Sequence, residues 1–121
     1  MGVTAVEARK RGDDVRTYTF EMAGVDRAIL DGETEGFGRF HVDTRNGKLL
    51  GATVVAAHAG ELISEAALAI TRGLTALAFS SVIHPYPTQS EVWKRLGDAV
   101  ARERLKPWLK RVFTRYLAWR R

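Results

Sequence analysis

Cysteine is absent from the 121 residues of this chain. Its absence excludes a disulfide framework, a thiolate zinc site and a cysteine nucleophile within these residues. Long apolar runs are missing too, because Leu49–Val55 with the two alanines that follow it falls far short of the roughly 20 residues that span a bilayer. We therefore expect a chain that does not cross a membrane. Because no segment resembles a signal peptide, we expect a cytoplasmic location.

Complete catalytic motifs are also absent. Gly36-Phe37-Gly38 precedes strand-like residues, whereas a dinucleotide-binding glycine loop opens a helix. The histidines His41, His58 and His84 are too scattered for a metal site, so we predict no bound metal and expect each at the surface or at a strand end. The residues alone thus reveal no self-sufficient active site.

The positive charge is concentrated at the C-terminus. The formal net charge is +5, with a sequence pI of about 10.0. Residues 102–121 hold eight of the nineteen Lys and Arg residues and one of the fourteen acids, a net charge of +7. Residues 1–101 keep eleven basic and thirteen acidic residues, a net charge of −2. A mildly acidic domain therefore carries a strongly basic tail.

What is present is an ordinary globular composition, with 45% apolar and 27% charged residues, sufficient for one compact domain. Thr4–Glu7 fits a capping box that opens a short helix, and Gly12 fits its end. Val15–Phe20 alternates polar and apolar residues, which predicts a strand with one wet face. Asp26–Asp31 is expected to form a short helical turn or loop.

A hairpin is predicted from two strand-like runs, Phe37–Thr44 and Lys48–Ala56, on either side of Arg45-Asn46-Gly47. An Asn-Gly pair favours a tight turn in which both residues have positive φ. Leu49–Val55 is apolar on both faces, so we expect it to be the central strand of the sheet.

Helical patterns follow the hairpin. Three segments are expected, over Glu61–Arg72, over Leu74–Ser80, and from a capping box at Thr88–Glu91 to about Leu105. Pro107 is expected to separate these from a last helix, Trp108–Arg120. The block order predicts an α+β fold, with a short N-terminal helix, an antiparallel sheet of three or four strands, and then three helices packed on one face.

The segment from Ile83 to Glu91 has an unusual local pattern. Tyr86 lies between two prolines, which stiffen the chain and fix the direction of the tyrosine. On local chemistry alone, a proline-kinked connector that caps the next helix is the favoured interpretation.

Several motifs in sequence order nevertheless resemble the C-terminal dimerisation domain of the pyridine nucleotide-disulfide oxidoreductases, over about Val3 to Leu105. They are Asp26-Arg27-Ala28, Glu35-Gly36-Phe37, the run from Gly47 to Val55, Ala59-Gly60-Glu61-Leu62-Ile63 and the ending Pro87-Thr88-Gln89-Ser90-Glu91. We therefore expect residues 1–105 to form this domain and residues 106–121 to form a basic amphipathic helix beyond it.

The resemblance implies a homodimer with FAD and NAD(P)H domains ahead of this one in the chain. In the family, a histidine before Pro-Thr acts as acid and base for the partner's redox dithiol, and a glutamate five residues later orients it. These positions are Tyr86 and Glu91 here. The resemblance also implies that the backbone at Tyr86 and Pro87 approaches the flavin of the partner subunit.

A tyrosine at this position is typical of the mercuric reductase-like branch rather than of dihydrolipoamide dehydrogenase-like members. The phenol of Tyr86, with a pKa near 10, is a poor proton shuttle for a thiol at neutral pH. Mercuric reductases of the resistance type typically end in a cysteine pair, which this tail lacks. We therefore expect a mercuric reductase-like flavoprotein without assigning mercury as its substrate.

The tail supports two interpretations. Its apolar residues follow helical spacing between basic ones, and they are Leu105, Trp108, Leu109, Val112, Phe113, Tyr116 and Trp119. Either this stripe packs on the domain or across a dimer, or the helix binds an anionic membrane surface or nucleic acid, which would make the protein membrane-peripheral or a non-enzymatic interaction module. A further alternative is a structural dimer that has lost its chemistry.

Overall fold

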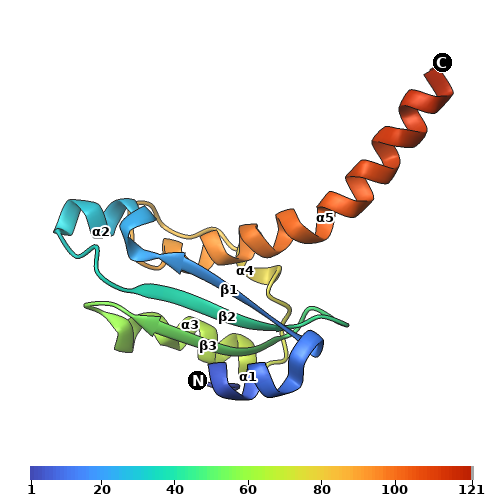
Figure 1. The fold of residues 1–121 in the computed structure, drawn as a ribbon. Helices are drawn as coiled ribbons and strands as arrows, with labels where there is room; N and C mark the ends of the chain where they lie inside the picture. The colour runs from blue at the N-terminus through green and yellow to red at the C-terminus, as the bar shows by residue number, and fades with distance from the viewer. Residues whose placement is uncertain (121) are drawn as a thin grey trace.

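The computed structural model describes residues 1–120, with the side chains of residues 105–110 left out. Three antiparallel strands, β1 (Val15–Glu21), β2 (Phe37–Asp43) and β3 (Leu49–Val55), form a sheet in the order β1-β2-β3 (Figure 1). Helices α1 (Ala5–Arg11) and α2 (Asp26–Asp31) flank β1 in the sequence, while α3 (Ala59–Thr71), α4 (Ala78–Ser81) and α5 (Glu91–Arg120) follow the sheet. The predicted α+β fold and its block order are confirmed.

The first helix ends where the sequence predicts. The Thr4 hydroxyl accepts a hydrogen bond from the backbone N–H of Glu7, which satisfies a donor at the start of α1. Gly12, with φ of 59°, follows the last residue of the helix. A left-handed residue after a helix is normally glycine, because a Cβ would be strained there.

The hairpin is confirmed, but its turn differs from the prediction. Asn46 does not have positive φ, and only Gly47 does, with φ of 75°. The N–H of Gly47 donates to the carbonyl oxygen of Asp43, 2.8 Å away, and the Asp43 carboxylate accepts from the N–H of Arg45. The Asp43 side chain therefore stabilises a longer loop in place of the two-residue turn.

β2, and not β3, is the central strand. β3 lies at the edge of the three-strand ladder, and its outer side is covered by the first residues of the chain. Gly2 pairs with Gly51, and the N–H of Val3 donates to the oxygen of Leu50. A Cβ on Gly51 would lie 2.1 Å from the oxygen of Val3, so only glycine permits this contact. The first residues of the chain therefore extend the sheet beyond the outer edge of β3, while α3 packs on the strand itself.

His41 is buried on β2, contrary to its predicted place at the surface or a strand end. Its Nδ1 lies 2.8 Å from the Thr17 hydroxyl on β1. Burial, with the nearby Arg39 charge, lowers the pKa of His41 below its ordinary value, so the imidazole is neutral at pH 7. The pattern of polar and apolar residues around His41 did not indicate its burial, because other segments of the chain cover this residue.

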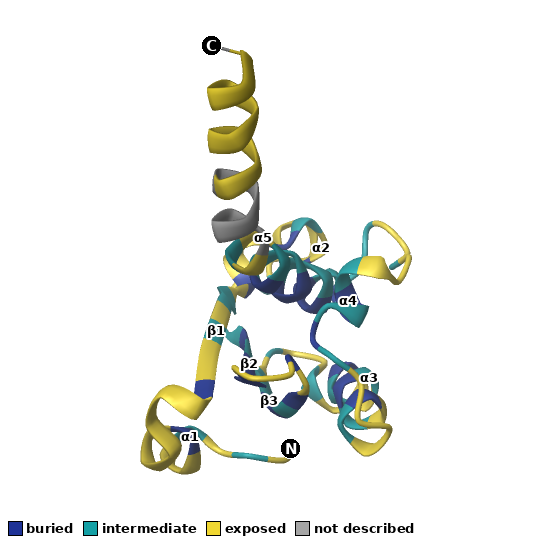
Figure 2. Cartoon of the chain, turned by 90° about the vertical axis from the view of Figure 1, so that its right-hand side faces the viewer, coloured by how far each residue is buried: buried dark blue, intermediate teal, exposed yellow. Residues whose placement is uncertain are grey.

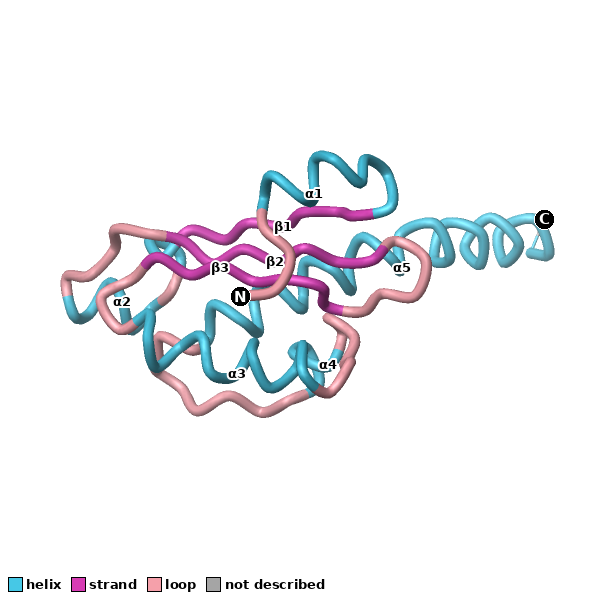
Figure 3. Tube along the Cα trace, turned by 90° about the horizontal axis from the view of Figure 1, so that it is seen from below, coloured by secondary structure: helices cyan, strands magenta, loops and turns pink. Residues whose placement is uncertain are grey.

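The core lies between the sheet and the helices after it. α3 packs on β3, whereas α5 packs on β1 and β2 and contacts α4. Trp93 of α5 is fully buried, stacks on Phe40 of β2 with ring centroids 5.3 Å apart, and donates from Nε1 to the carbonyl oxygen of Leu62 on α3. One side chain therefore links two helices and the central strand. Figure 3 shows α3 and α5 lying against the three strands.

α5 continues through position 107 to Arg120, so Pro107 does not separate two helices as predicted. A proline removes one backbone donor, and a long helix tolerates this loss by bending. Figure 1 shows the outer part of α5 leaving the domain at an angle to the part on the sheet. Among the described residues, no helix is both long and apolar enough to span a bilayer.

The buried tryptophan provides a stability test. We expect Trp93→Ala to lower the free energy of unfolding by about 3–5 kcal/mol, because it leaves a large cavity between sheet and helices. Trp93→Phe should cost less, since it keeps a ring against Phe40 but loses the bond to Leu62. The measurement is denaturant unfolding, and Trp119→Ala, at a residue 84% exposed, is the matched control. Equal losses for both alanine variants would contradict the packing described here.

Candidate functional site

The loop between α4 and α5 carries the predicted site residues and is anchored at His84. The imidazole Nε2 of His84 lies 2.5 Å from the Glu65 carboxylate on α3, and its Nδ1 lies 3.1 Å from the carbonyl oxygen of Val82. Only 5% of the His84 side chain is exposed, so the prediction that this histidine lies at the surface is wrong. The anchor fixes the loop two residues before Tyr86.

Tyr86 projects to the surface of the protomer, with 70% of the residue exposed. Its hydroxyl donates a hydrogen bond of 2.6 Å to the Asp26 carboxylate at the start of α2. This bond and the Asp26 charge raise the pKa of Tyr86 above its ordinary value near 10, with a smaller contribution from the Glu91 charge. The phenol therefore stays protonated at neutral pH.

Glu91, the first residue of α5, lies beside Arg95 rather than bonded to Tyr86. Its Oε1 accepts from Arg95 Nε at 3.2 Å, and 12% of its side chain is exposed. Its Oε2 is buried without a hydrogen-bond partner among the described residues. The Glu91 charge therefore contributes to the raised pKa of Tyr86 only in a minor way, while the carboxylate that holds the phenol is Asp26.

The sequence motif around Asp26 contributed to the family resemblance, yet it did not reveal this contact. Asp26 lies 60 residues before Tyr86 in the sequence. Nothing in the local pattern of a short helix indicates which distant loop its first residue meets. Only the packing of α2 beside the α4–α5 loop brings the two together.

The predicted capping box at Thr88 does not form. The Thr88 hydroxyl donates to the carbonyl oxygen of Pro85 at 2.6 Å and lies 2.9 Å from the Ser90 hydroxyl. The backbone N–H of Glu91 instead donates to the backbone oxygen of Thr88. Thr88 therefore closes the turn that follows Tyr86, and the Tyr86-Pro87 peptide bond within that turn is cis.

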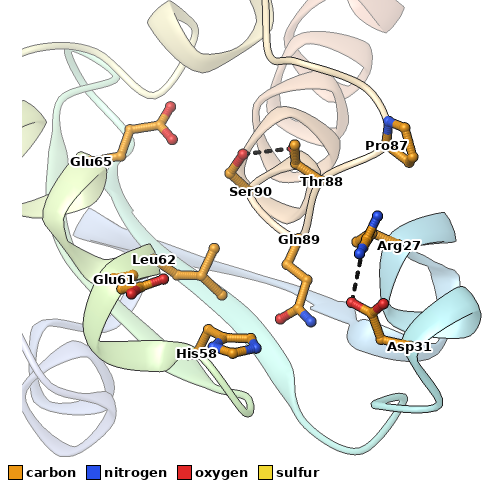
Figure 4. Close-up of a pocket in the computed structure, with 10 residues that line it drawn as sticks. All are labelled: Arg27, Asp31, His58, Glu61, Leu62, Glu65, Pro87, Thr88, Gln89 and Ser90. Atoms are coloured by element: carbon orange, nitrogen blue, oxygen red, sulfur yellow. Dashed lines mark hydrogen bonds and ion pairs between the residues drawn. The ribbon is translucent and has the colours of Figure 1, made fainter.

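An open polar cleft of about 570 Å³ lies beside this turn (Figure 4). Its walls come from α2, from α3 with the residue before it, and from the turn ahead of α5. Gln89 is buried at one side, where its Nε2 donates to Glu33 at 2.6 Å and its Oε1 has no partner among the described residues. Among the described residues, no three or more His, Asp or Glu side chains gather in a group that could hold a metal ion.

An apolar groove of about 370 Å³ lies on the other side of His84, between α3, α4 and the start of the loop. Its rim includes Leu68, Val82 and Ile83, all exposed, and Ile83 is 93% exposed. Large aliphatic side chains clustered at the surface are typical of a protein–protein interface. The groove is therefore a candidate subunit-interaction surface, and Tyr86 follows Pro85, which lines it.

The comparisons with known proteins identify the family. Residues 1–96 match the family model described as the pyridine nucleotide-disulphide oxidoreductase dimerisation domain. The chain belongs to this family, as the resemblance predicted. The match ends within α5, so the outer part of this helix lies beyond it.

Curated relatives include two kinds of enzyme. The dihydrolipoyl dehydrogenase of Thermus scotoductus is 38% identical over 103 residues, which cover 85% of this chain and 22% of that protein. The mercuric reductase of Lysinibacillus sphaericus is 35% identical over 91 residues, which cover 75% of this chain and 17% of that protein. The chain therefore spans about a fifth of the length of such relatives.

Solved structures share the fold. The Cu(II) complex of RclA from Escherichia coli, an HOCl-induced flavoprotein disulfide reductase, superposes with a TM-score of 0.77 at 27% identity, covering 82% of this chain and 22% of that one. LpdA from Mycobacterium tuberculosis gives a TM-score of 0.77 at 23% identity, with the same coverage of both chains. The family is named for its pyridine nucleotide, and RclA is a flavoprotein, in agreement with the cofactors that the resemblance implied.

The titration of Tyr86 provides a test of the site geometry. We expect Asp26→Asn to lower the pKa of Tyr86, because the variant removes the carboxylate that disfavours the phenolate. Ultraviolet titration of tyrosinate, with Tyr86→Phe to assign the signal, measures the shift. Asp31→Asn, on the same helix but paired with Arg27, is the matched control and should leave the Tyr86 titration in place. No change with Asp26→Asn would contradict the bond.

Proposed function

We propose that this chain is the homodimerisation domain of an FAD-dependent NAD(P)H oxidoreductase of the mercuric reductase-like type. In this proposal Tyr86 and Glu91 complete the active site of the partner subunit. The observation that carries it is the exposure of Tyr86 on a loop anchored at His84 and Thr88, beside an exposed apolar groove. A side chain displayed at the edge of a subunit interface can reach across it.

Tyr86 would act as a hydrogen-bonding group rather than as a proton shuttle. A phenol has one donor and also accepts through its oxygen. With its proton directed at Asp26, the Tyr86 oxygen can accept from a thiol of the partner or contribute to a bound metal ion. The raised pKa supports this role, because proton transfer at neutral pH needs a group that titrates near pH 7.

Glu91 would act on the same site through its charge. Its Oε2 is buried and unpartnered among the described residues, and a buried carboxylate oxygen normally has a hydrogen-bond partner. A donor from the other subunit would reach this oxygen only if dimer formation opened the cover over it. Within the protomer, the ion pair with Arg95 holds the Glu91 carboxylate in place.

The flavin contact concerns Tyr86 and Pro87. FAD supplies electron transfer between NAD(P)H and the acceptor when it is bound. Residues 82–87 form no regular secondary structure, and Tyr86 is exposed, so their backbone is accessible to a flavin held by the partner's other domains. This chain's own part is to present the loop and shield the site from water.

A second candidate function uses the basic tail as an interaction module for an anionic membrane surface or nucleic acid. The observation that favours it is that residues 111–120 are all exposed, so this part of the stripe does not pack on its own domain. The predicted stripe residues Leu105, Trp108 and Leu109 have side chains outside the described ones. A docking helix and a dimerisation domain can coexist in one protein.

Removal of the phenol tests the catalytic role. In the flavoprotein that carries this domain, we expect Tyr86→Phe to reduce kcat on the order of 100-fold, because one preorganised hydrogen-bonding group is lost from the reacting centre. Turnover with mercuric ion, disulfides and other acceptors is the measurement. Tyr18→Phe, the same change on β1, is the control. Wild-type turnover of Tyr86→Phe with every acceptor would remove the catalytic assignment.

The dimer is tested on the apolar groove. We expect the double variant Leu68→Asp, Ile83→Asp to shift the chain toward monomer in sedimentation analysis, because burying two carboxylates in an apolar interface is strongly unfavourable. Val6→Asp, at an exposed residue on α1, should leave the dimer intact. If the unmutated 121-residue chain is a strict monomer at high concentration, its interface is not sufficient for dimer formation, although family membership stands.

A further inference from the structure

The outer part of α5 projects from the domain as an exposed helix. Every residue from 111 to 120 is exposed, and Figure 2 shows this stretch extending away from the sheet and the other helices. Four of its exposed residues are large hydrophobic side chains at helical spacing, and a tryptophan follows them. They are Val112, Phe113, Tyr116, Leu117 and Trp119.

This exposed stripe lies on the face of α5 opposite to its buried stripe. Leu96 and Val100 are fully buried against the domain. At about 100° per residue, Tyr116 lies roughly 160° around the helix axis from Val100. The stripe that closes the core therefore does not extend into the outer helix, and cover for the outer stripe has to come from another surface.

The charge around the stripe indicates which kind of surface would cover it. Residues 102–121 carry a net charge of +7, and the stretch 111–120 contains Arg111, Arg115 and Arg120 with no acidic residue. A second copy of this helix would bring like charges together, which disfavours a helix pair as the occupant. The complementary surface is anionic.

The aromatic and aliphatic side chains select further. Duplex DNA would neutralise the arginines but would leave Phe113 and Leu117 in water, since its surface offers charge without an apolar layer. A bilayer interface offers both, because anionic headgroups lie above acyl chains and tryptophan and tyrosine settle at that boundary. A basic helix with one apolar face fits this environment.

We infer that residues 111–120 of α5 lie in the surface of a membrane that contains anionic lipid, with Phe113, Tyr116 and Leu117 in the interface and the arginines on the headgroups. This inference rests on the second candidate function and names its partner. It is independent of the role of Tyr86. The domain would then be held at the membrane by the same helix that begins at Glu91.

Vesicle binding tests the inference on the 121-residue chain. The probes are vesicles of phosphatidylserine mixed with phosphatidylcholine and vesicles of phosphatidylcholine alone, with binding measured by co-sedimentation at low and high salt. We expect binding to the mixed vesicles, weakened by salt because headgroup attraction is screened. Binding to neither vesicle at low salt would overturn the inference.

Two tail variants separate charge from apolar contact. Arg111→Gln with Arg115→Gln should weaken binding to the mixed vesicles by about 30-fold. Each arginine near the headgroups contributes about 1 kcal/mol of attraction, and the variant removes two of them. Phe113→Ser with Leu117→Ser should weaken it as well while keeping the salt dependence. Circular dichroism and sedimentation confirm that the variants keep the fold and the oligomeric state.

A matched charge change on α1 is the control. Arg9→Gln with Arg11→Gln removes the same charge from another exposed basic segment and should change binding by less than about threefold, because the effect depends on position in the tail. Equal effects of the two arginine pairs, or no effect of the Phe113 and Leu117 variant, would overturn the inference. Duplex DNA binding without vesicle binding would overturn it and leave the second candidate function standing.

Discussion

The packing of Trp93 between the sheet and α3 is the contact on which the site depends. Its ring lies parallel to that of Phe40, with an interplanar angle of 3°, and Phe79 of α4 contacts Phe40 with centroids 4.8 Å apart. Such pairs stabilise beyond the area they bury. Because Nε1 of Trp93 also donates to Leu62, the start of α5 is fixed against β2, α3 and α4 together. Glu91 lies two residues before this anchor, so its position follows from the core.

Close approach of the backbone makes this packing feasible at two glycines. A Cβ on Gly38 of β2 would lie 2.7 Å from the side chain of Val92, and one on Gly97 would lie 2.7 Å from the backbone nitrogen of Ser80. The first glycine lets α5 lie close to the sheet, and the second lets α4 lie close to α5. The loop that carries Tyr86 spans only the gap between these two closely packed helices. Its reach is therefore set by core packing at one end and by the His84–Glu65 contact at the other.

What the sequence could predict depended on how local the cause was. The Thr4 cap and the end of α1 at Gly12 depend on residues within a few positions, and both are confirmed. The prediction that β3 is the central strand was wrong. The backbone that pairs with its outer edge comes from residues 1–3, which lie about fifty positions away in the sequence. The predicted exposure of His41 was wrong for the same reason, since its burial depends on segments that are distant in the sequence.

The candidate site divides along the same line. The segment around Tyr86 was found from its two prolines and the motif that follows, and its irregular conformation is dictated by those prolines. The partner of the phenol was not found, because Asp26 reaches it only through tertiary packing. Thr88 shows that even a local motif can be overridden. Its hydroxyl donates to the carbonyl oxygen of Pro85, and the N–H of Glu91 donates to the backbone oxygen of Thr88 rather than to the hydroxyl.

The uneven distribution of charge follows from the two tasks of α5. Its inner part must enter a core, and there Val92, Trp93, Leu96 and Val100 are fully buried. Its outer part has no core to enter, and there the arginines are placed around side chains that no described residue covers. The two parts have different apolar faces, which is why the helix as a whole looks only weakly amphipathic although each part has its own stripe. A single helix can therefore close a domain and present a second surface, provided that its apolar face changes direction between the two.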